Sequence, residues 1–476
     1  MADGMVSDFT IQDASEGLHD LELTEHGVAL AFARRHKDAL RYCHHTGAWF
    51  EWTGTHWKRN ETKRAFSWAR RLVAELNRDA EFKTKAITGK AAFAAAVERF
   101  AQADEAFAVT SEAWDADPWL LGTSGGVVDL RTGELRPARP ADMMTRVCAT
   151  APALDGAAPP DRWLTFLDEA TGKDDALIRF LQRWCGYCLT GDTREHALLF
   201  GYGPGGNGKS VFLNTLAGIM SDYATTAAMD TFTASQGDKH PTDLAMLRGA
   251  RLVTATETEE GRAWAEARIK QMTGGDPITA RFMRQDFFTF RPQFKLTIVG
   301  NHKPVLRNVD DAARRRFNIV PFILKPAEPD RELERKLEAE WPGILAWMIE
   351  GCLAWQREGL SRPNVVLEAT DEYFKAQDHF GRWLDECCNL VPTMSTKPVD
   401  LLRSFQQWCQ MNGEEDADNR RLRGMIERTP GLRYATNKGM HWVRGIGIKP
   451  PPKRAREGQD DAAGGDGVMG GEGSNP

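Results

Sequence analysis

The chain has 476 residues, of which 42% are hydrophobic, and it carries a formal net charge of −6 at pH 7. This length suggests about three domains, and the acidic balance excludes a uniformly basic nucleic-acid binder. No apolar run approaches the roughly 18 residues of a membrane helix, and residues 1–25 lack an export signal. The eight scattered cysteines are typical of reduced thiols. We therefore expect a cytoplasmic protein without membrane contact.

The N-terminal part is predicted to be an arm followed by a small mixed domain. Residues 1–25 contain seven acids and no lysine or arginine, which favours a flexible acidic arm. Residues 26–150 predict an α+β accessory domain. Its expected elements, in chain order, are a helix over 28–42, a hairpin over 48–57, alanine-rich helices over 62–108 and strands over 119–135 joined at 132–133.

Two clusters in this accessory domain resemble ligand sites. Trp49, Trp52 and Trp57 could stack on bases, but such aromatics are more typical of the core of a small domain. His36 lies close in sequence to the cysteine and histidines of 43–45, yet no second ligand pair follows. We therefore expect core tryptophans and no zinc site.

Two short motifs are also better explained by structure than by chemistry. Asp115 and Asp117 form the D-x-D pattern that a polymerase or primase uses for two metals, but no apolar strand precedes them. Cys185 and Cys188 form a C-x-x-C without a second pair. We expect loop acids in the first case and packed thiols in the second.

A linker and two helices lead into the central part of the chain. Residues 150–160 are rich in alanine and proline, which is typical of a linker. Two amphipathic helices are expected over 161–190, broken at Gly172. The apolar run 197–200 then predicts a buried strand, and 211–216 predicts the start of a helix.

Between that strand and that helix lies a phosphate-binding motif. Gly203, Gly208, Lys209 and Ser210 fit G-x-x-x-x-G-K-[ST]. Glycines let successive backbone N–H groups turn toward phosphate oxygens, the lysine adds a positive charge, and the serine hydroxyl can ligate Mg²⁺. We expect ATP and Mg²⁺ to bind at nine residues, namely Gly203, Pro204, Gly205, Gly206, Asn207, Gly208, Lys209, Ser210 and Val211.

Acidic and amide side chains follow two further predicted strands. The apolar run from Arg251 ends in acids, with Glu257 at the strand end and Glu259 two residues later. A nucleotide hydrolase needs one acid to hold Mg²⁺ and another to orient the attacking water. Asn301 closes the buried strand 294–300, where an amide can contact the γ-phosphate or position that water.

Three arginines precede the last predicted strand of this region. The segment 310–316 ends in Arg-Arg-Arg, and the strand 317–322 follows. Such a run can be a solvated face, or it can place an arginine finger on the γ-phosphate held by a neighbouring subunit. We favour the finger, at Arg315 or Arg316, because the phosphate loop, the acids and the amide lie in the same stretch.

These residues together resemble the superfamily 3 helicase core. Four motifs are similar, more narrowly, to the phage and plasmid primase-helicase family, whose relatives include poxvirus uncoating-type ATPases. The motifs are Leu252–Glu257, Thr273–Asp276, Ile278–Arg281 and Asn301–Pro304. The resemblance is close over residues 161–325 and looser over 26–150.

The resemblance implies an α/β fold with a P-loop AAA+-type parallel sheet, in a ring that is usually a hexamer and moves 3′ to 5′ on one DNA strand. It implies that Glu257 is the metal acid, Asn301 the sensor and Arg315 or Arg316 the finger. It also places the DNA contact of the ring on a hairpin with strands over 278–283 and 288–291. The matching residues there are Arg281 and Arg284.

Three departures from the family pattern affect these expectations. The acids are split as Glu257 and Glu259 rather than adjacent, which leaves the catalytic base open. The hairpin tip lacks the usual lysine or histidine. Residues 26–160 offer no metal triad for a primase, so we expect a helicase without a primase domain.

The C-terminal part is predicted to be a DNA-binding domain. Residues 330–358 are strongly helical, with Gly343 and Gly351 interrupting an apolar face, and complete a helicase domain and helical lid over 161–360. Residues 371–449 predict three helices and a hairpin, the winged-helix pattern, and 450–476 a disordered tail. Residues 419–449 contain eight basic residues and one acid. The expected DNA contacts are Arg420, Arg421, Arg423 and Lys438.

We therefore predict an ATP-dependent DNA helicase of phage or mobile-element replication, encoded by a phage or prophage. Its expected partners are single-stranded and forked DNA, further copies of the same chain and a separate primase or replication protein. One alternative is a replication initiator whose nucleotide controls assembly without unwinding. Another is a P-loop kinase, which the arginine run and the basic C-terminal segment disfavour.

Overall fold

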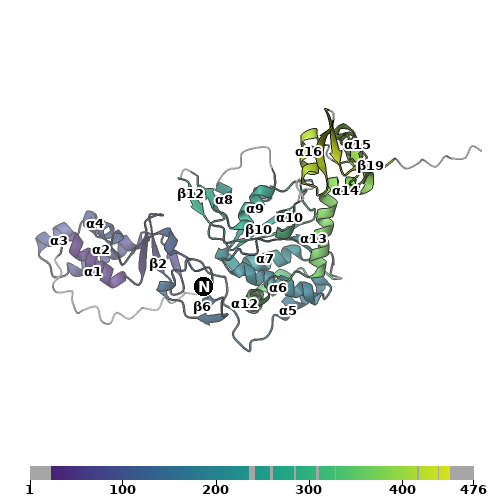
Figure 1. The fold of residues 1–476 in the computed structure, drawn as a ribbon. Coiled ribbons are helices and arrows are strands. Elements are labelled where there is room, and N and C mark those ends of the chain that lie inside the picture. The colour runs from purple at the N-terminus through teal and green to yellow at the C-terminus, as the bar shows by residue number, and fades with distance from the viewer. Residues whose placement is uncertain are drawn as a thin grey trace, which may run out of the picture. The chain divides into compact units, whose positions relative to one another are not determined.

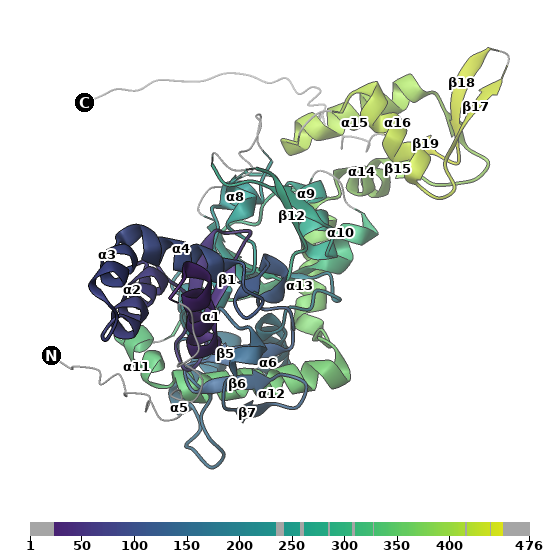
Figure 2. The ribbon, with the colours of Figure 1, turned by 90° about the vertical axis from the view of Figure 1, so that its left-hand side faces the viewer.

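The computed structural model describes residues 23–234, 242–257, 261–283, 286–306, 310–326, 328–414, 417–437 and 439–450. The chain divides into two compact units between Gln377 and Asp378. Figure 1 shows the elements of both units, and Figure 2 shows them turned by 90°. Most of the predicted acidic arm and nearly all of the predicted tail lie outside the described residues. Among the described residues, no helix is long and apolar enough to cross a membrane.

The first part of the larger unit packs helices against a four-stranded sheet with the order β3-β2-β1-β4. Its elements are α1 (Glu25–His36), β1 (Leu40–Cys43), β2 (Ala48–Trp52), β3 (Trp57–Arg59), α2 (Arg64–Leu76), α3 (Phe82–Thr88), α4 (Ala91–Gln102) and β4 (Ala108–Val109). The prediction of a hairpin over 48–57 is confirmed by the antiparallel pairing of Trp52 with Trp57. Trp49 and Trp57 are buried, as expected for core residues, whereas Trp52 is half-buried.

The predicted helix over 28–42 is too long. The helix ends at His36, and Leu40 to Cys43 form a strand that pairs with β2 on one side and with β4 on the other. Leu40 and Cys43 are fully buried in this sheet. Local apolar spacing could not reveal this boundary, because it depends on partner strands that come later in the chain.

A second, three-stranded sheet follows, with the order β5-β6-β7. Its strands are β5 (Leu120–Thr123), β6 (Gly126–Asp129) and β7 (Glu134–Arg136), with the short helices η1 (Ser111–Ala113) and η2 (Pro140–Asp142) beside them. Asp117 pairs with Arg131 at 2.8 Å, and Asp115 accepts from the backbone N–H of Thr145 at 2.8 Å. Both acids therefore serve as loop residues, as predicted.

A five-stranded parallel sheet forms the centre of the larger unit, which confirms the α/β part of the prediction. Its order is β14-β8-β13-β10-β9. The strands are β8 (Leu198–Tyr202), β9 (Ala224–Thr226), β10 (Leu252–Glu257), β13 (Lys295–Gly300) and β14 (Phe317–Pro321). Because side chains alternate along a strand, Leu199 and Val320 enter one hydrophobic cluster, whereas Leu198 and Ile319 enter another.

Helices cover both faces of this sheet. One cluster receives side chains from α5 (Asp161–Thr171), α6 (Asp175–Leu189), α7 (Lys209–Met220) and α12 (Trp341–Glu358). The other receives side chains from α9 (Glu266–Gly274), α10 (Asp311–Arg316) and α13 (Asn364–Gln377). The remaining elements of this part are η3 (Ser221–Tyr223), η4 (Met229–Thr231), α8 (Thr242–Ala245), β11 (Ile278–Ala280), β12 (Phe288–Phe290) and α11 (Leu333–Ala339).

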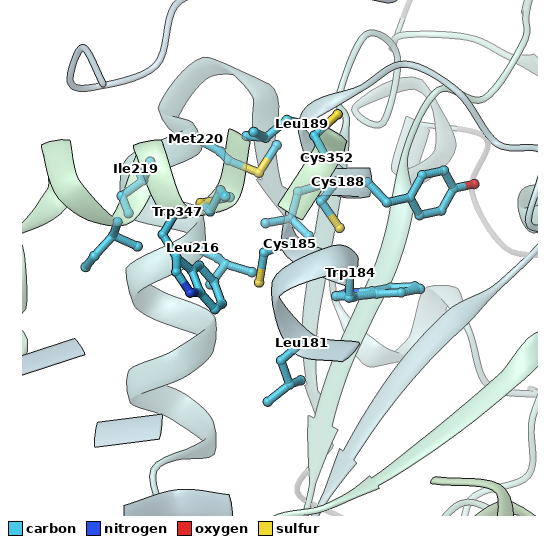
Figure 3. Packing of buried hydrophobic residues seen from close by; sticks show 14 of the residues in the cluster. Leu181, Trp184, Cys185, Cys188, Leu189, Leu216, Ile219, Met220, Trp347 and Cys352 are labelled. Carbon is cyan, nitrogen blue, oxygen red and sulfur yellow. The ribbon is translucent and has the colours of Figure 1, made fainter. Parts of the chain in front are cut away.

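Helices α6 and α12 approach each other through glycines. A Cβ atom added at Gly351 would lie 2.1 Å from the backbone oxygen of Gln182, and one added at Gly186 would lie 2.0 Å from the backbone nitrogen of Cys352. Gly351 lies inside a continuous helix, and its lack of a side chain on the buried face permits the close packing of the two helices. Cys185 and Cys188 are buried in the same cluster (Figure 3).

The smaller unit begins later than predicted. Residues 371–377 are the last residues of α13, and this helix is bonded to the larger unit. Thr370 accepts from the N–H of Ile319 at 3.1 Å, and Tyr373 accepts from Trp264 at 2.9 Å. The predicted start at residue 371 therefore falls inside a helix of the larger unit. The smaller unit contains α14 (His379–Cys387), β15 (Cys388–Asn389), β16 (Ser395–Thr396), α15 (Pro398–Asn412), α16 (Asn419–Arg428), β17 (Arg433–Asn437), β18 (Met440–Arg444) and β19 (Gly447–Ile448).

The elements of the smaller unit enclose a core of their own. Trp383, Phe405 and Trp408 pack with Leu422 and Val443 in one buried cluster. Strands β16, β18 and β17 form a three-stranded antiparallel sheet beside the helices. The predicted set of three helices and a hairpin is present, while its assignment as a winged helix stays a prediction.

Candidate functional site

The carboxyl ends of four parallel strands meet at one edge of the central sheet. Glu257, the last residue of β10, is the register partner of Gly300 at the end of β13. Gly300 is paired with Tyr202, the last residue of β8, and Tyr202 is paired with Pro321 of β14. The residues that follow these strands are therefore brought to the same edge, where open α/β sheets bind their ligands.

The glycine-rich loop predicted from the sequence leaves β8 at this edge and enters α7. Gly205, Gly206 and Gly208 have φ values of +94°, +69° and +81°, which residues other than glycine rarely adopt. Helix α7 then begins at Lys209, so the loop ends on a helix N-terminus. The unpaired N–H groups and partial positive charge of a helix start favour anions.

Lys209 is held inside this loop by neutral oxygen atoms. Its Nζ donates to the backbone oxygen of Gly203 at 2.7 Å and to Oδ1 of Asn207 at 2.8 Å. The Asn207 side chain is buried and donates in turn to the backbone oxygen of Phe322, just beyond β14. Burial lowers the pKa of Lys209. No carboxylate of the described residues forms an ion pair with it, so its charge is available to an anion.

Glu257 and Asn301 lie on the same cavity as the loop. Glu257 is buried, with 3% of its surface exposed, and Asn301 is exposed. A Cβ atom added at Gly300 would lie only 2.8 Å from Cβ of Glu257, so a side chain at that position would displace the carboxylate. The predicted second acid, Glu259, lies outside the described residues.

The cavity has a volume of about 420 Å³ and extends beyond the predicted residues. Its further walls come from α5 and from the segment after β14, including Arg162, Phe166, Leu324 and Asp330. Arg162 approaches Asp330 at 3.8 Å, which joins the two walls. Sequence reasoning missed these residues, because they belong to no motif and only the fold brings them to the phosphate loop.

The three arginines lie in the last turn of α10 and have different surroundings. Arg314 pairs with Asp371 at 3.2 Å. Arg316 is half-buried and donates from Nη1 to the backbone oxygen of Ala312 at 2.7 Å. Arg315 is exposed, and its Nε contacts the backbone oxygen of Asp311 at 3.3 Å. Neither of the two predicted finger residues lines the cavity of its own chain.

The predicted DNA-contacting residues are divided between the two units. In the larger unit, β11 and β12 form the expected hairpin, with strands shorter than predicted, and the guanidinium of Arg281 lies 4.8 Å from the ring centre of Phe287. In the smaller unit, Arg420 and Arg421 are exposed on α16. Arg423 pairs with Glu427 at 2.8 Å on the same helix. Two further predicted residues, Arg284 and Lys438, lie outside the described residues.

Comparisons with known families match two parts of the chain. Residues 29–172 match the family described as D5 N terminal like. Residues 201–316, which include the glycine-rich loop, Glu257 and Asn301, match a family of unknown function.

Curated relatives are viral proteins named as helicases or primases. "Putative helicase L207/L206" of Acanthamoeba polyphaga mimivirus is 25% identical over 326 residues, which cover 63% of this chain and 34% of the relative. "Putative helicase 022R" of Frog virus 3 is 26% identical over 262 residues, which cover 50% of this chain and 27% of the relative. "Putative primase C962R" of African swine fever virus is 22% identical over 338 residues, which cover 63% of this chain and 34% of the relative. The chain thus spans about a third of the length of these relatives.

A solved structure also aligns over most of the chain. The apo structure of the C-terminal region of NrS-1 gives a TM-score of 0.47 at 11% sequence identity, and the alignment covers 86% of this chain and 96% of that one.

Proposed function

We propose that the chain is an ATP-dependent DNA helicase that acts in phage or mobile-element replication. The observation that carries the proposal is the meeting of Lys209, Glu257 and Asn301 around one cavity at the carboxyl edge of a parallel sheet. The strand order, in which β8 lies between β13 and β14, agrees with an AAA+-type core. Relatives named as helicases support the same conclusion.

The residues at the cavity fit a nucleoside triphosphate with Mg²⁺. The cavity offers about 420 Å³, an ammonium held by two neutral oxygens, a serine hydroxyl and a buried carboxylate. Mg²⁺, when bound, neutralises charge on the phosphate oxygens. Ser210 and Glu257 would hold it, and the backbone N–H groups of residues 205–211 would hold the phosphates.

The chain's own groups then account for hydrolysis. Lys209 exchanges its neutral acceptors, the oxygens of Gly203 and Asn207, for phosphate oxygens, and this charge-assisted contact is stronger. Asn301 orients the attacking water with its amide, and Glu257 or Glu259 accepts the proton from that water.

The second half of the site is proposed to come from a neighbouring copy. Arg315 and Arg316 do not line the cavity of their own chain, so a finger from either residue requires a homo-oligomer, for which we propose a hexameric ring. Turnover in the ring would move Arg281 and Arg284 along one DNA strand, from 3′ to 5′. The smaller unit would bind DNA as a winged helix through Arg420, Arg421, Arg423 and Lys438, and a separate primase or replication protein would complete the machinery.

Strand displacement on a forked duplex tests the proposal. We expect the wild-type chain to unwind the fork with ATP and to hydrolyse ATP faster when single-stranded DNA is present. Lys209→Ala should lower the hydrolysis rate by about 100-fold or more, because a preorganised charge at the phosphates is lost.

Two results would contradict the proposal in different ways. DNA binding without unwinding would favour a nucleotide-controlled initiator. ATP hydrolysis that DNA does not stimulate would favour a phosphotransferase.

A further inference from the structure

The hairpin of β11 and β12 is anchored in the core at its base and exposes large apolar side chains toward its tip. Ile278, Ala280 and Phe290 are buried in the cluster beneath the sheet. Met283 and Phe287 are 69% and 60% exposed. A folded domain usually buries such side chains, and exposed apolar groups gathered in one place indicate a binding surface.

On this hairpin Phe282 and Phe287 are exposed and Phe288 is half-buried, and arginine side chains lie against two of these three rings. The rings of Phe282 and Phe288 are stacked, with centres 5.4 Å apart and an interplanar angle of 24°. Arg281 lies 4.8 Å from the ring centre of Phe287, and Arg248, which follows α8, lies 5.1 Å from that of Phe288. Among the described residues, no carboxylate forms an ion pair with Arg281. The surface therefore offers stacking planes and positive charge together.

We infer that this aromatic hairpin, defined by Phe282, Phe287 and Phe288, stacks on the bases of single-stranded DNA. The inference rests on the proposed function, and it adds that the hairpin recognises bases as well as the phosphate backbone. Bases of every sequence have a flat face, so aromatic stacking supplies affinity without sequence preference. Arg281 and Arg248 contribute the attraction to phosphates that such contacts need. The affinity of the hairpin for DNA would then depend on the presence of bases. A hairpin that binds only phosphates would have the same affinity with and without them.

Binding to abasic DNA tests the inference on the full chain. The probes are a fluorescent oligothymidine and an oligonucleotide of equal length whose nucleotides lack bases, both measured with a non-hydrolysable ATP analogue. We expect the wild-type chain to bind oligothymidine about 10- to 100-fold more tightly than the abasic probe, the range that one or two stacked bases supply.

Variants separate stacking from general apolar contact and from charge. The double variant Phe282→Leu, Phe287→Leu keeps apolar side chains but removes two of the aromatic rings. We therefore expect this variant to bind oligothymidine and the abasic probe with equal affinity. Arg281→Ala should weaken both probes by the same factor. Phe82→Leu, at an 85% exposed phenylalanine on α3, is the matched control and should change neither.

Three other outcomes would contradict the inference. Equal binding of both probes by the wild-type chain would overturn the stacking inference while leaving the helicase proposal intact. A loss of both probes in the leucine variant, together with a lower mass by light scattering, would show instead that the hairpin is an interface between copies. Failure of the wild-type chain to bind either probe would overturn the proposed function as well.

Discussion

At the phosphate loop, a single asparagine connects three parts of the site. Asn207 contacts the Lys209 ammonium with its oxygen and the backbone oxygen of Phe322 with its nitrogen. The loop is thereby tied to the end of β14, and two strands, β8 and β13, lie between β14 and the strand β10 that ends at Glu257. Because the side chain is buried, both of its contacts are shielded from water and hold the lysine in place. The motif itself specifies only the glycines, the lysine and the serine.

Two basic side chains are buried at the opposite, N-terminal edge of the sheet. Arg251 donates to the backbone oxygens of Leu189 at 2.6 Å and Leu120 at 2.8 Å. Lys295 donates to the backbone oxygens of Thr190, of Asp192 at 3.3 Å and of Gln293 at 3.2 Å. Both residues thus satisfy carbonyls at the end of α6. Burial lowers the pKa of Lys295 to about 7.

Lys295 should therefore make stability depend on pH. Its pKa is about 7 in the folded chain, whereas the ordinary pKa of a lysine is 10.5, so between these pH values the unfolded chain binds a proton that the folded chain lacks. The free energy of unfolding should rise with pH across this window, by about 1 kcal/mol per unit. Lys295→Met should remove this contribution to the slope, whatever it does to stability at a single pH.

Urea unfolding of both chains at pH 7, 8 and 9 measures the effect. Parallel stability profiles for the wild-type chain and Lys295→Met would contradict the prediction. The comparison with the variant is necessary because Arg251 and Asp192 also act on the charge of Lys295.

At the scale of elements, the crossing of α6 and α12 determines how the helical layer packs on the sheet. Gly186 and Gly351 bring the two backbones together, and Trp347 and Cys352 of α12 then enter the cluster that also contains Trp184 and Leu216 (Figure 3). The same layer supports the candidate cavity, because Glu340, at the start of α12, accepts from the backbone N–H groups of Arg162 and Trp163 at 3.0 and 2.9 Å.

Gly351→Ala should destabilise the larger unit by about 1–3 kcal/mol or more, because the new methyl group would meet the backbone of Gln182 and force the helices apart. Gly343→Ala is the control on the same helix, since its nearest neighbour would be a side-chain atom of Pro160 at 3.2 Å. The control should stay within about 0.5 kcal/mol of the wild type, as better helix propensity offsets a mild contact. Thermal unfolding of the two variants measures the difference, and equal melting temperatures would contradict the packing argument.

At the scale of the whole molecule, the proposed site is complete only when two copies meet. Arg314 is engaged with Asp371, and Arg316 is half-buried against its own helix, so the exposed Arg315 is the best placed of the three to reach a neighbour. A strictly monomeric ATPase would contradict this arrangement.

Mixing two inactive variants tests the shared site. Lys209→Ala retains the finger and Arg315→Ala retains the phosphate loop, so each interface that pairs an intact loop with an intact finger regains a complete site. About a quarter of the interfaces should do so in an equal, random mixture, and hydrolysis should return in proportion if neighbouring sites act independently. ATP hydrolysis by the mixture, compared with that of each variant alone, is the measurement. Absence of rescue, with oligomers confirmed by light scattering, would contradict a finger supplied in trans.

The sequence by itself determined the elements whose signals are local. The strand-loop-helix order around Lys209, the strand that ends at Glu257 and the strand before Asn301 follow from apolar runs and turn residues a few positions apart. The hairpin of β11 and β12 was predictable for the same reason, whereas the parallel α/β core was expected from the family resemblance. Because backbone preferences and side-chain alternation act over a few residues, these features are encoded where they occur.

Only the tertiary structure decided what depends on distant partners. The strand at Leu40 needs β2 and β4, and the walls of the cavity at Arg162 and Asp330 are 168 positions apart in the numbering. The role of Gly351 depends on Gln182, which no local pattern can reveal. Burial, close packing and the meeting of strand ends are properties of the folded arrangement, and they brought Lys209, Glu257 and Asn301 together at one cavity.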